Sequence, residues 1–143
     1  MPKRQLDNLV ASGHLKAEPP AASEIEGLIR SGEARLRDAE NEGLALESRF
    51  DLAYNAAHAL ALAALRWHGY RAEKRYMVFQ ALAHTLSLPA PQWRILADAH
   101  RRRNVIEYEG VADVDQALVA GVVSVTKEMA KRLRALGSLK PSG

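Results

Sequence analysis

SRFDLAYNAAHALALAALRWHGYR, residues 48–71, is the stretch that decides the fold. Alanine and larger apolar side chains recur in it at intervals of three and four residues, which is the spacing of one face of an α-helix. We expect a helix from Leu44 to Trp67. Gly69 is the signal that stops it, because glycine readily adopts the left-handed conformation found just after a helix C-terminus. Its alanines favour helix formation and let a neighbouring helix approach closely. The sequence therefore predicts a helical protein built around this segment.

Helical spacing also marks the segments on either side of this central helix. The further helices that we expect lie over residues 2–15, 23–40, 73–88 and 91–108, with a last one that starts at Asp113 or Asp115. Ser23 and Glu26 have the spacing of a capping box at the start of the second helix. Strand-like alternation and 20–50 residue repeats are both absent.

The predicted fold is therefore an all-α, up-and-down bundle of about five main helices plus a short N-terminal helix. We divide the chain into residues 1–22, a short helix and a proline-containing linker; residues 23–137, the bundle; and residues 138–143, a frayed tail.

Composition narrows the class of protein further. The chain has 143 residues, of which 48% are hydrophobic, so we expect one domain with a real core. No stretch of 18 uncharged apolar residues occurs, and the start MPKRQLDNLV lacks the apolar region of a secretory signal, so we expect a cytoplasmic protein without a membrane span. The absence of cysteine excludes disulfides, thiolate catalysis and cysteine-based metal centres.

The net charge of +3 hides an uneven distribution. Residues 23–51 carry eight acids against four arginines, whereas residues 66–103 carry eight bases against two acids. Such a separation suits an anionic ligand or an acidic partner. The basic side chains that we expect to contact a nucleic-acid phosphate are Arg71, Lys74, Arg75, Arg101 and Arg102.

The stretch AHRRRNVIEYEG, residues 99–110, breaks the apolar pattern of its own helix. On a helical wheel at about 100° per residue, the stripe that starts at Trp93 continues through His100, Asn104 and Glu107. Arg103 and Tyr108 lie on its two flanks. Charged groups on an inward face are costly unless they are paired, hydrogen-bonded or open to a ligand, so this is the candidate site.

Two interpretations of these residues stay open. In the first, they form an ordinary network of ion pairs and caps, with Arg103 paired to an acid of residues 23–51. In the second, they handle a phosphate. A metal site is disfavoured because no second histidine follows His100 by four residues and asparagine is a poor zinc ligand, so we expect no metal and no cofactor.

The two stretches together resemble the HEPN superfamily over about Leu44–Gly110. Its signature is an arginine, four to six residues and a histidine, often with asparagine after the arginine. Arg103 and Asn104 match this pattern here, whereas the histidine position falls on Tyr108. The resemblance implies a helical bundle, commonly a homodimer, and in many members a metal-independent endoribonuclease of toxin–antitoxin or defence systems.

In such an enzyme the arginine holds the scissile phosphate and the histidine activates the ribose 2′-hydroxyl. Our first hypothesis is an RNA-binding or RNA-cleaving protein that uses Arg103, Asn104 and either Tyr108 or His100, with Glu107 orienting them. The second is a catalytically silent bundle that dimerises or binds a partner, for example a nucleotidyltransferase or an antitoxin. A third, a DNA-binding module, is disfavoured because Trp93 and Leu96 turn that helix toward the core.

Overall fold

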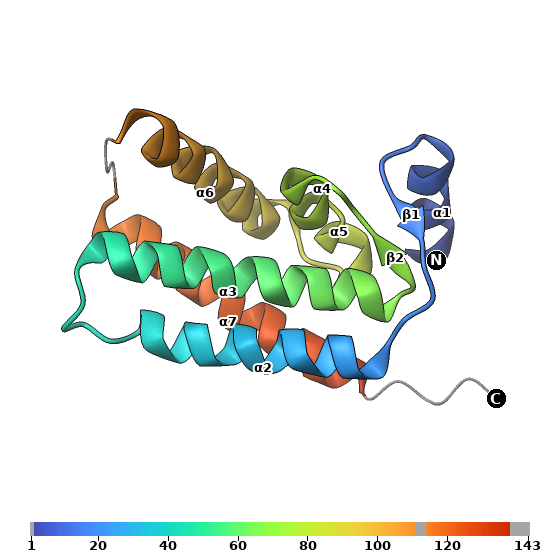
Figure 1. The fold of residues 1–143 in the computed structure, drawn as a ribbon, viewed down its shortest axis with the longest axis horizontal. Helices are drawn as coiled ribbons and strands as arrows, with labels where there is room; N and C mark the ends of the chain where they lie inside the picture. Colours follow the sequence, from blue (N-terminus) through green and yellow to red (C-terminus); the bar gives the residue numbers. More distant parts are fainter. Residues whose placement is uncertain (1, 111–113, 138–143) are drawn as a thin grey trace.

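The computed structural model describes residues 2–110 and 114–137 and shows an all-α bundle (Figure 1). Its centre is α3 (Leu46–Trp67), which packs against α2 (Ala22–Ala39) and α7 (Gln116–Leu136). The predicted central helix is thus confirmed, with its start two residues later than expected. None of the helices in the described part of the chain combines the length and the apolarity needed to cross a membrane.

Small side chains allow α2 and α3 to pack at close range. Alanines 53, 56, 57, 61, 63 and 64 of α3 are almost fully buried. Opposite them, a Cβ atom added to Gly32 of α2 would lie 2.8 Å from Leu60 Cδ2 and 3.3 Å from the Ala56 carbonyl oxygen. Only glycine fits this position without a shift of its neighbours, which explains a glycine inside a helix that it weakens.

Local signals explain most of the helix ends. Gly69 follows α3 with φ of +92°, and Gly110 ends α6 (Ala90–Glu109) with φ of +68°, as expected of left-handed C-caps. Asp115 accepts a hydrogen bond from the Leu118 amide and caps α7, whereas Asp113 lies outside the described residues. The predicted capping box is wrong: α2 begins after Ala21, so Ser23 already lies inside the helix and makes no cap.

The expected helix over residues 73–88 is divided into α4 (Arg75–Gln80) and α5 (Leu82–Thr85). At the division, the His84 amide bonds to the Ala81 carbonyl in a tight i to i+3 turn. After α5, Ser87 takes φ of +53° and the Leu88 amide reaches back to the Leu82 carbonyl, which ends the helical segment. Periodicity shows the apolar face of such a segment but not these local turns.

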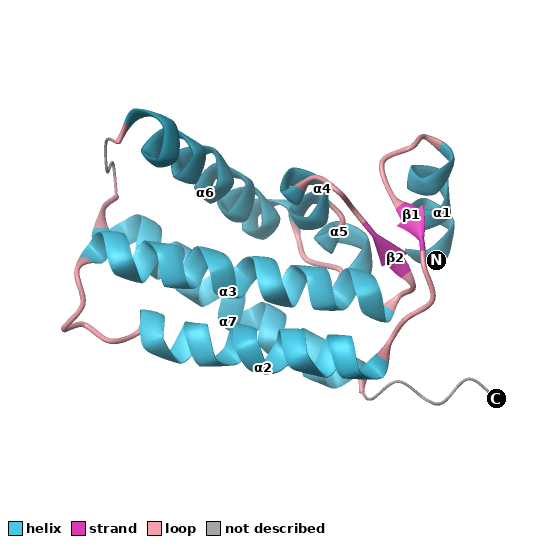
Figure 2. Cartoon of the chain, in the orientation of Figure 1, coloured by secondary structure: helices cyan, strands magenta, loops and turns pink. Residues whose placement is uncertain are grey.

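The N-terminal segment is tied to the bundle. In α1 (Pro2–Ala11), Leu6 is fully buried, and α1 packs against α5. After it, β1 (Lys16–Ala17) pairs antiparallel with β2 (Tyr70–Arg71), a short bridge that the sequence did not predict (Figure 2). The Tyr70 hydroxyl donates to Asp7, and burial together with this bond raises the pKa of Tyr70 to about 12.

A buried arginine holds the proline-containing linker against α3. Arg66 is 1% exposed and pairs with Glu24 at 2.7 Å. Its guanidinium also donates to the carbonyl oxygens of Glu18 and Pro19, at 3.0 and 2.7 Å. Because a buried charge is stable only when it is fully paired, this network fixes the path of the chain from β1 into α2.

Candidate functional site: a histidine–arginine cluster between three helices

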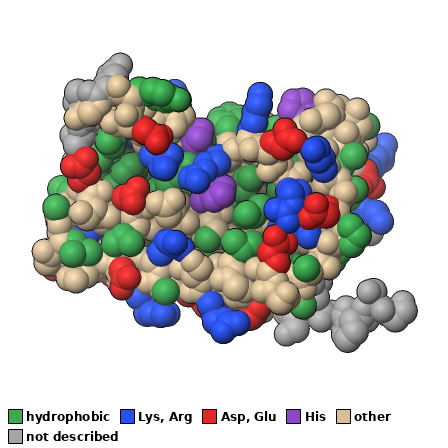
Figure 3. Space-filling view, in the orientation of Figure 1, with side chains coloured by type: hydrophobic (Ala, Val, Ile, Leu, Met, Phe, Trp, Pro, Cys, Tyr) green, Lys and Arg blue, Asp and Glu red, His purple; other side chains and the backbone are tan. Residues whose placement is uncertain are grey.

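The candidate site lies where α3, α4 and α6 meet. Its members, which we call the histidine–arginine cluster, are Tyr54, His58, Arg75, His100, Arg103 and Asn104. The three helices contact one another in pairs, and α6 then diverges from α3 toward its C-terminal end (Figure 1). Blue and purple side chains gather over this junction in the space-filling view of Figure 3.

His100 is held by hydrogen bonds at both ring nitrogens. Nδ1 lies 2.9 Å from the Tyr54 hydroxyl oxygen, and Nε2 lies 3.4 Å from Nδ2 of Asn104. The Asn104 amide group donates, so Nε2 carries the lone pair and Nδ1–H donates to Tyr54. The bond to Asn104 is long and therefore weak, which leaves Nε2 ready to accept a proton from another donor.

Two arginines flank the same tyrosine. Their guanidinium carbons lie 5.1 Å (Arg103) and 5.8 Å (Arg75) from the centre of the Tyr54 ring, within the range of cation–π contacts. Arg75 forms no ion pair with any described residue, and its buried Nη1 has no hydrogen-bond partner among them. A buried, unsatisfied guanidinium nitrogen is costly, so this nitrogen is suited to an anionic ligand.

The arginines and the loss of hydration keep both histidines uncharged. Burial, with Arg75 and Arg103 adding repulsion, holds the pKa of His100 below its usual value. The same causes, with His100 as a further contributor, lower the pKa of His58 to about 4. At neutral pH the cluster therefore offers two cationic guanidinium groups next to neutral imidazoles, a combination that can bind a phosphate and accept a proton.

Aromatic contacts fix the positions of these rings. Phe79 of α4 is fully buried, with its ring centroid 5.9 Å from that of His58 and 6.3 Å from that of His100. The Tyr54 and His100 rings are stacked at 6.2 Å. The cluster is thus built on packed side chains of helices, which hold a site more firmly than loops do.

Of the predicted catalytic residues, the structure brings three together and leaves two at the surface. His100, Arg103 and Asn104 lie in the cluster. Glu107, with a side chain 60% exposed, pairs with Arg103 at 3.4 Å, one turn away on the same helix and not with an acid of residues 23–51. Tyr108 is 86% exposed and makes no hydrogen bond with a described residue.

The predicted phosphate-binding residues are divided between the cluster and the surface. Arg75 belongs to the cluster. Arg101 and Arg102 both pair with Asp98, at 2.9 and 3.1 Å, and Asp98 and Arg102 line a hollow between α6 and α7. Arg71 is held by Glu18 and Glu24, whereas Lys74 has no ion pair with a described residue.

Two residues of the cluster, Tyr54 and His58, were not predicted from the sequence. Periodicity places Tyr54 on the apolar face of the central helix, and His58 has no metal-ligand or catalytic spacing to another histidine. A signal was nevertheless present, because the two residues stand four apart and so lie on the same face of α3. Only the packing of α6 against α3 shows that this face meets His100.

The described residues contain no group of three or more histidine and acidic side chains that would hold a metal ion. No protein-family model matches the chain, and no curated protein matches it in sequence. The interpretation of the site therefore rests on its own geometry and on the motif.

Proposed function

We propose that this chain is an HEPN-type protein that binds RNA and cleaves it without a metal ion, using the histidine–arginine cluster. The observation that carries the proposal is the meeting of Arg103 and Asn104, which match the HEPN signature, with a neutral histidine and a second arginine from another helix. Neither His100 nor Arg75 is needed by the fold as an ion-pair partner, and both are suited to phosphodiester chemistry.

In this proposal the two guanidinium groups bind the scissile phosphate and neutralise the charge that grows on it in the transition state. His100 Nε2 takes the proton of the ribose 2′-hydroxyl, and the 2′ oxygen forms a bond to phosphorus. The bond from phosphorus to the 5′ oxygen breaks, and that oxygen takes a proton from water. The products are a 2′,3′-cyclic phosphate and a 5′-hydroxyl, while His100 returns its proton to solvent.

His100 supplies the base that the motif position of Tyr108 lacks. A tyrosine, with an ordinary pKa near 10, is a poor base at neutral pH. Tyr54 keeps the His100 ring oriented through Nδ1, as a carboxylate or carbonyl does in other enzymes. Tyr54 and Asn104 are therefore positioning residues, and His100 with the two arginines would contact the substrate.

The test is cleavage of a labelled single-stranded RNA in EDTA at a saturating excess of protein. Wild type is expected to cleave it, and Arg103→Ala to lower the single-turnover rate at least 100-fold. The matched control is Arg94→Ala, an exposed arginine on the same helix that lies over Trp93, outside the cluster. Equal loss in both variants, or no cleavage by the wild type over varied RNAs, would reject the nuclease proposal.

A second candidate function is a silent bundle that dimerises or binds a partner, such as a nucleotidyltransferase or an antitoxin. The specific observation in its favour is the apolar surface that α6 exposes near its end, at Val105 (44% exposed) and Tyr108. A stable homodimer in sedimentation experiments, together with absent cleavage, would select this function. Sedimentation as a monomer that cleaves RNA would exclude it.

A further inference from the structure

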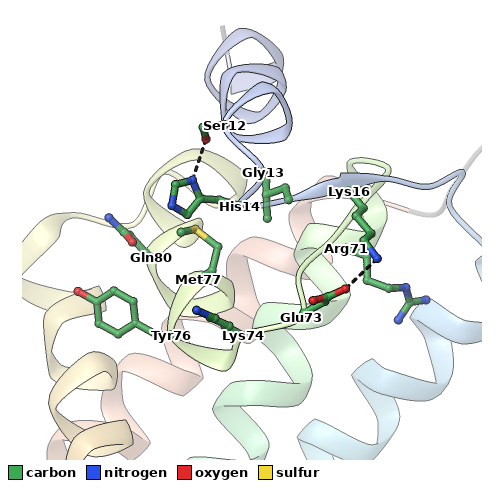
Figure 4. A pocket seen from close by; sticks show the side chains of 11 residues that line it. Ser12, Gly13, His14, Lys16, Arg71, Glu73, Lys74, Tyr76, Met77 and Gln80 are labelled. Carbon is green, nitrogen blue, oxygen red and sulfur yellow. Dashed lines mark hydrogen bonds and ion pairs between the residues drawn. The ribbon is translucent and has the colours of Figure 1, made fainter.

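A cavity of about 480 Å³ lies between the segment that follows α1 and the segment that leads from β2 into α4 (Figure 4). Its walls are the loop and strand after α1, residues 12–16, and the segment from β2 into α4. Lys74, Tyr76 and Met77 face it from α4 and its N-cap, and His14 faces it from the loop. Its volume lies within the range of cavities that bind small organic ligands.

Most of the cations in this wall are already compensated. Lys16 pairs with Glu73 at 2.8 Å, and Arg71 pairs with Glu18 and Glu24 at 2.8 Å each. Lys74 has no ion pair with a described residue. Lys74 is therefore the lining cation that a single phosphate group can pair with most readily, although its charge also acts on Glu73.

The uncharged side chains of the wall suit a flat, polar ring. Tyr76 is 46% exposed, so part of its ring is accessible to a ligand, and it lies two residues after Lys74. Met77 adds a polarisable apolar surface, and the Gln80 amide can both donate to and accept from the edge of a base. Aromatic side chains beside a cation are the usual elements of proteins that bind single-stranded nucleic acid.

The helix α4 connects this cavity to the cluster. Arg75, between Lys74 and Tyr76 in the chain, turns instead toward Tyr54 in the cluster. Consecutive residues of the chain thus point to the two sites, and this adjacency is the basis for assigning neighbouring nucleotides of one strand to them.

We infer that this cavity binds the nucleotide next to the scissile phosphate of an RNA strand, with its base stacked on Tyr76 and its phosphate on Lys74. The inference rests on the proposed function and adds to it a subsite outside the HEPN motif. In this arrangement the loop after α1, with His14, forms one wall of the substrate site.

The first test measures binding of a fluorescent 2′-O-methyl RNA decamer, which the proposed chemistry cannot cleave, by anisotropy. Tyr76→Ala is expected to raise Kd at least fivefold, and Tyr76→Phe, which keeps the ring, less than twofold. Lys74→Ala is expected to lower the slope of log affinity against log salt concentration by nearly the value of one phosphate contact. The control is Lys131→Ala, which removes an exposed lysine of α7 and should leave this slope unchanged. Equal Kd values for wild type and Tyr76→Ala would overturn the inference.

The second test separates this inference from the proposed function. Uridine monophosphate, with inorganic phosphate as a comparison, is titrated into the ¹⁵N-labelled wild type. Amide shifts at residues 12–16 and 74–80 that uridine monophosphate causes and phosphate does not would support the cavity. Shifts confined to the surroundings of His100 would reject the cavity and leave the cluster proposal standing, whereas cavity shifts without any RNA cleavage would reject the nuclease proposal alone.

Discussion

Replacing His58 with glutamine should remove a large share of the acid sensitivity of this fold. His58 has a pKa of about 4 in the folded protein, against 6.5 for an unperturbed histidine, because burial and nearby Arg75 and Arg103 oppose its charge. The unfolded chain therefore binds the proton more readily than the folded one between these values. Stability from this group is fully present above pH 6.5 and is lost as the pH falls through about 4.

The shift corresponds to about 3 kcal/mol in the free energy of unfolding, at about 1.4 kcal/mol per pKa unit. Solvent screening of a ring that is not fully buried lowers the expected value to about 2 kcal/mol. Urea denaturation at pH 7.5 and pH 4.5 measures this quantity for wild type and His58→Gln. Between pH 7.5 and pH 4.5 the free energy of unfolding should fall by about 2 kcal/mol more in the wild type than in the variant. Other acid-sensitive groups, such as Glu24, contribute to both proteins and so cancel in this comparison.

His14→Gln is the control for the substitution itself, because His14 is an exposed histidine on the loop after α1. A direct check that needs no variant is the NMR titration of the His58 ring in the folded protein. A midpoint near 6.5, or the same acid sensitivity in wild type and His58→Gln, would refute the electrostatic description of the cluster.

Three further changes test the packing and the orientation of the site. Gly32→Ala should destabilise the fold by about 1–3 kcal/mol in urea denaturation because its Cβ meets Leu60, whereas Gly27→Ala on the same helix, with open space around it, should be neutral or stabilising. Arg66→Met should cost about 3 kcal/mol in the same assay, since the carbonyls and carboxylates of its network lose their donor. Tyr54→Phe should keep the fold and lower RNA cleavage about tenfold, since His100 loses the partner of Nδ1; an unchanged rate would show that the hydroxyl has no role.

The helices were predictable from the sequence because their signals are local. The alanine-rich face of α3, the glycines after α3 and α6, and the Asp115 cap each depend on residues within a few positions of one another. The division of residues 73–88 into α4 and α5 at Ala81 was not predictable, since alanine favours a continuous helix, and Ser87 after α5 gives no sign of its left-handed conformation. The β1–β2 bridge joins residues more than fifty positions apart, and two-residue strands have no alternation to detect.

The candidate site was predictable only in part for the same reason. His100, Arg103 and Asn104 lie on one helix. Their spacing therefore predicts that these polar side chains lie on or beside its inward face. Tyr54 and Arg75 join them through the packing of α3 and α4 against α6, which no spacing in the sequence encodes.

Single-turnover cleavage of RNA in EDTA by wild type and His100→Ala, with analysis of the product ends, tests directly whether His100 is the base of a metal-independent nuclease. The wild type is expected to leave 2′,3′-cyclic phosphate and 5′-hydroxyl ends, and His100→Ala to react at least 100-fold more slowly, because the variant lacks the base that activates the 2′-hydroxyl. Cleavage by His100→Ala at the wild-type rate, or wild-type products that carry 5′-phosphate ends, would contradict this mechanism.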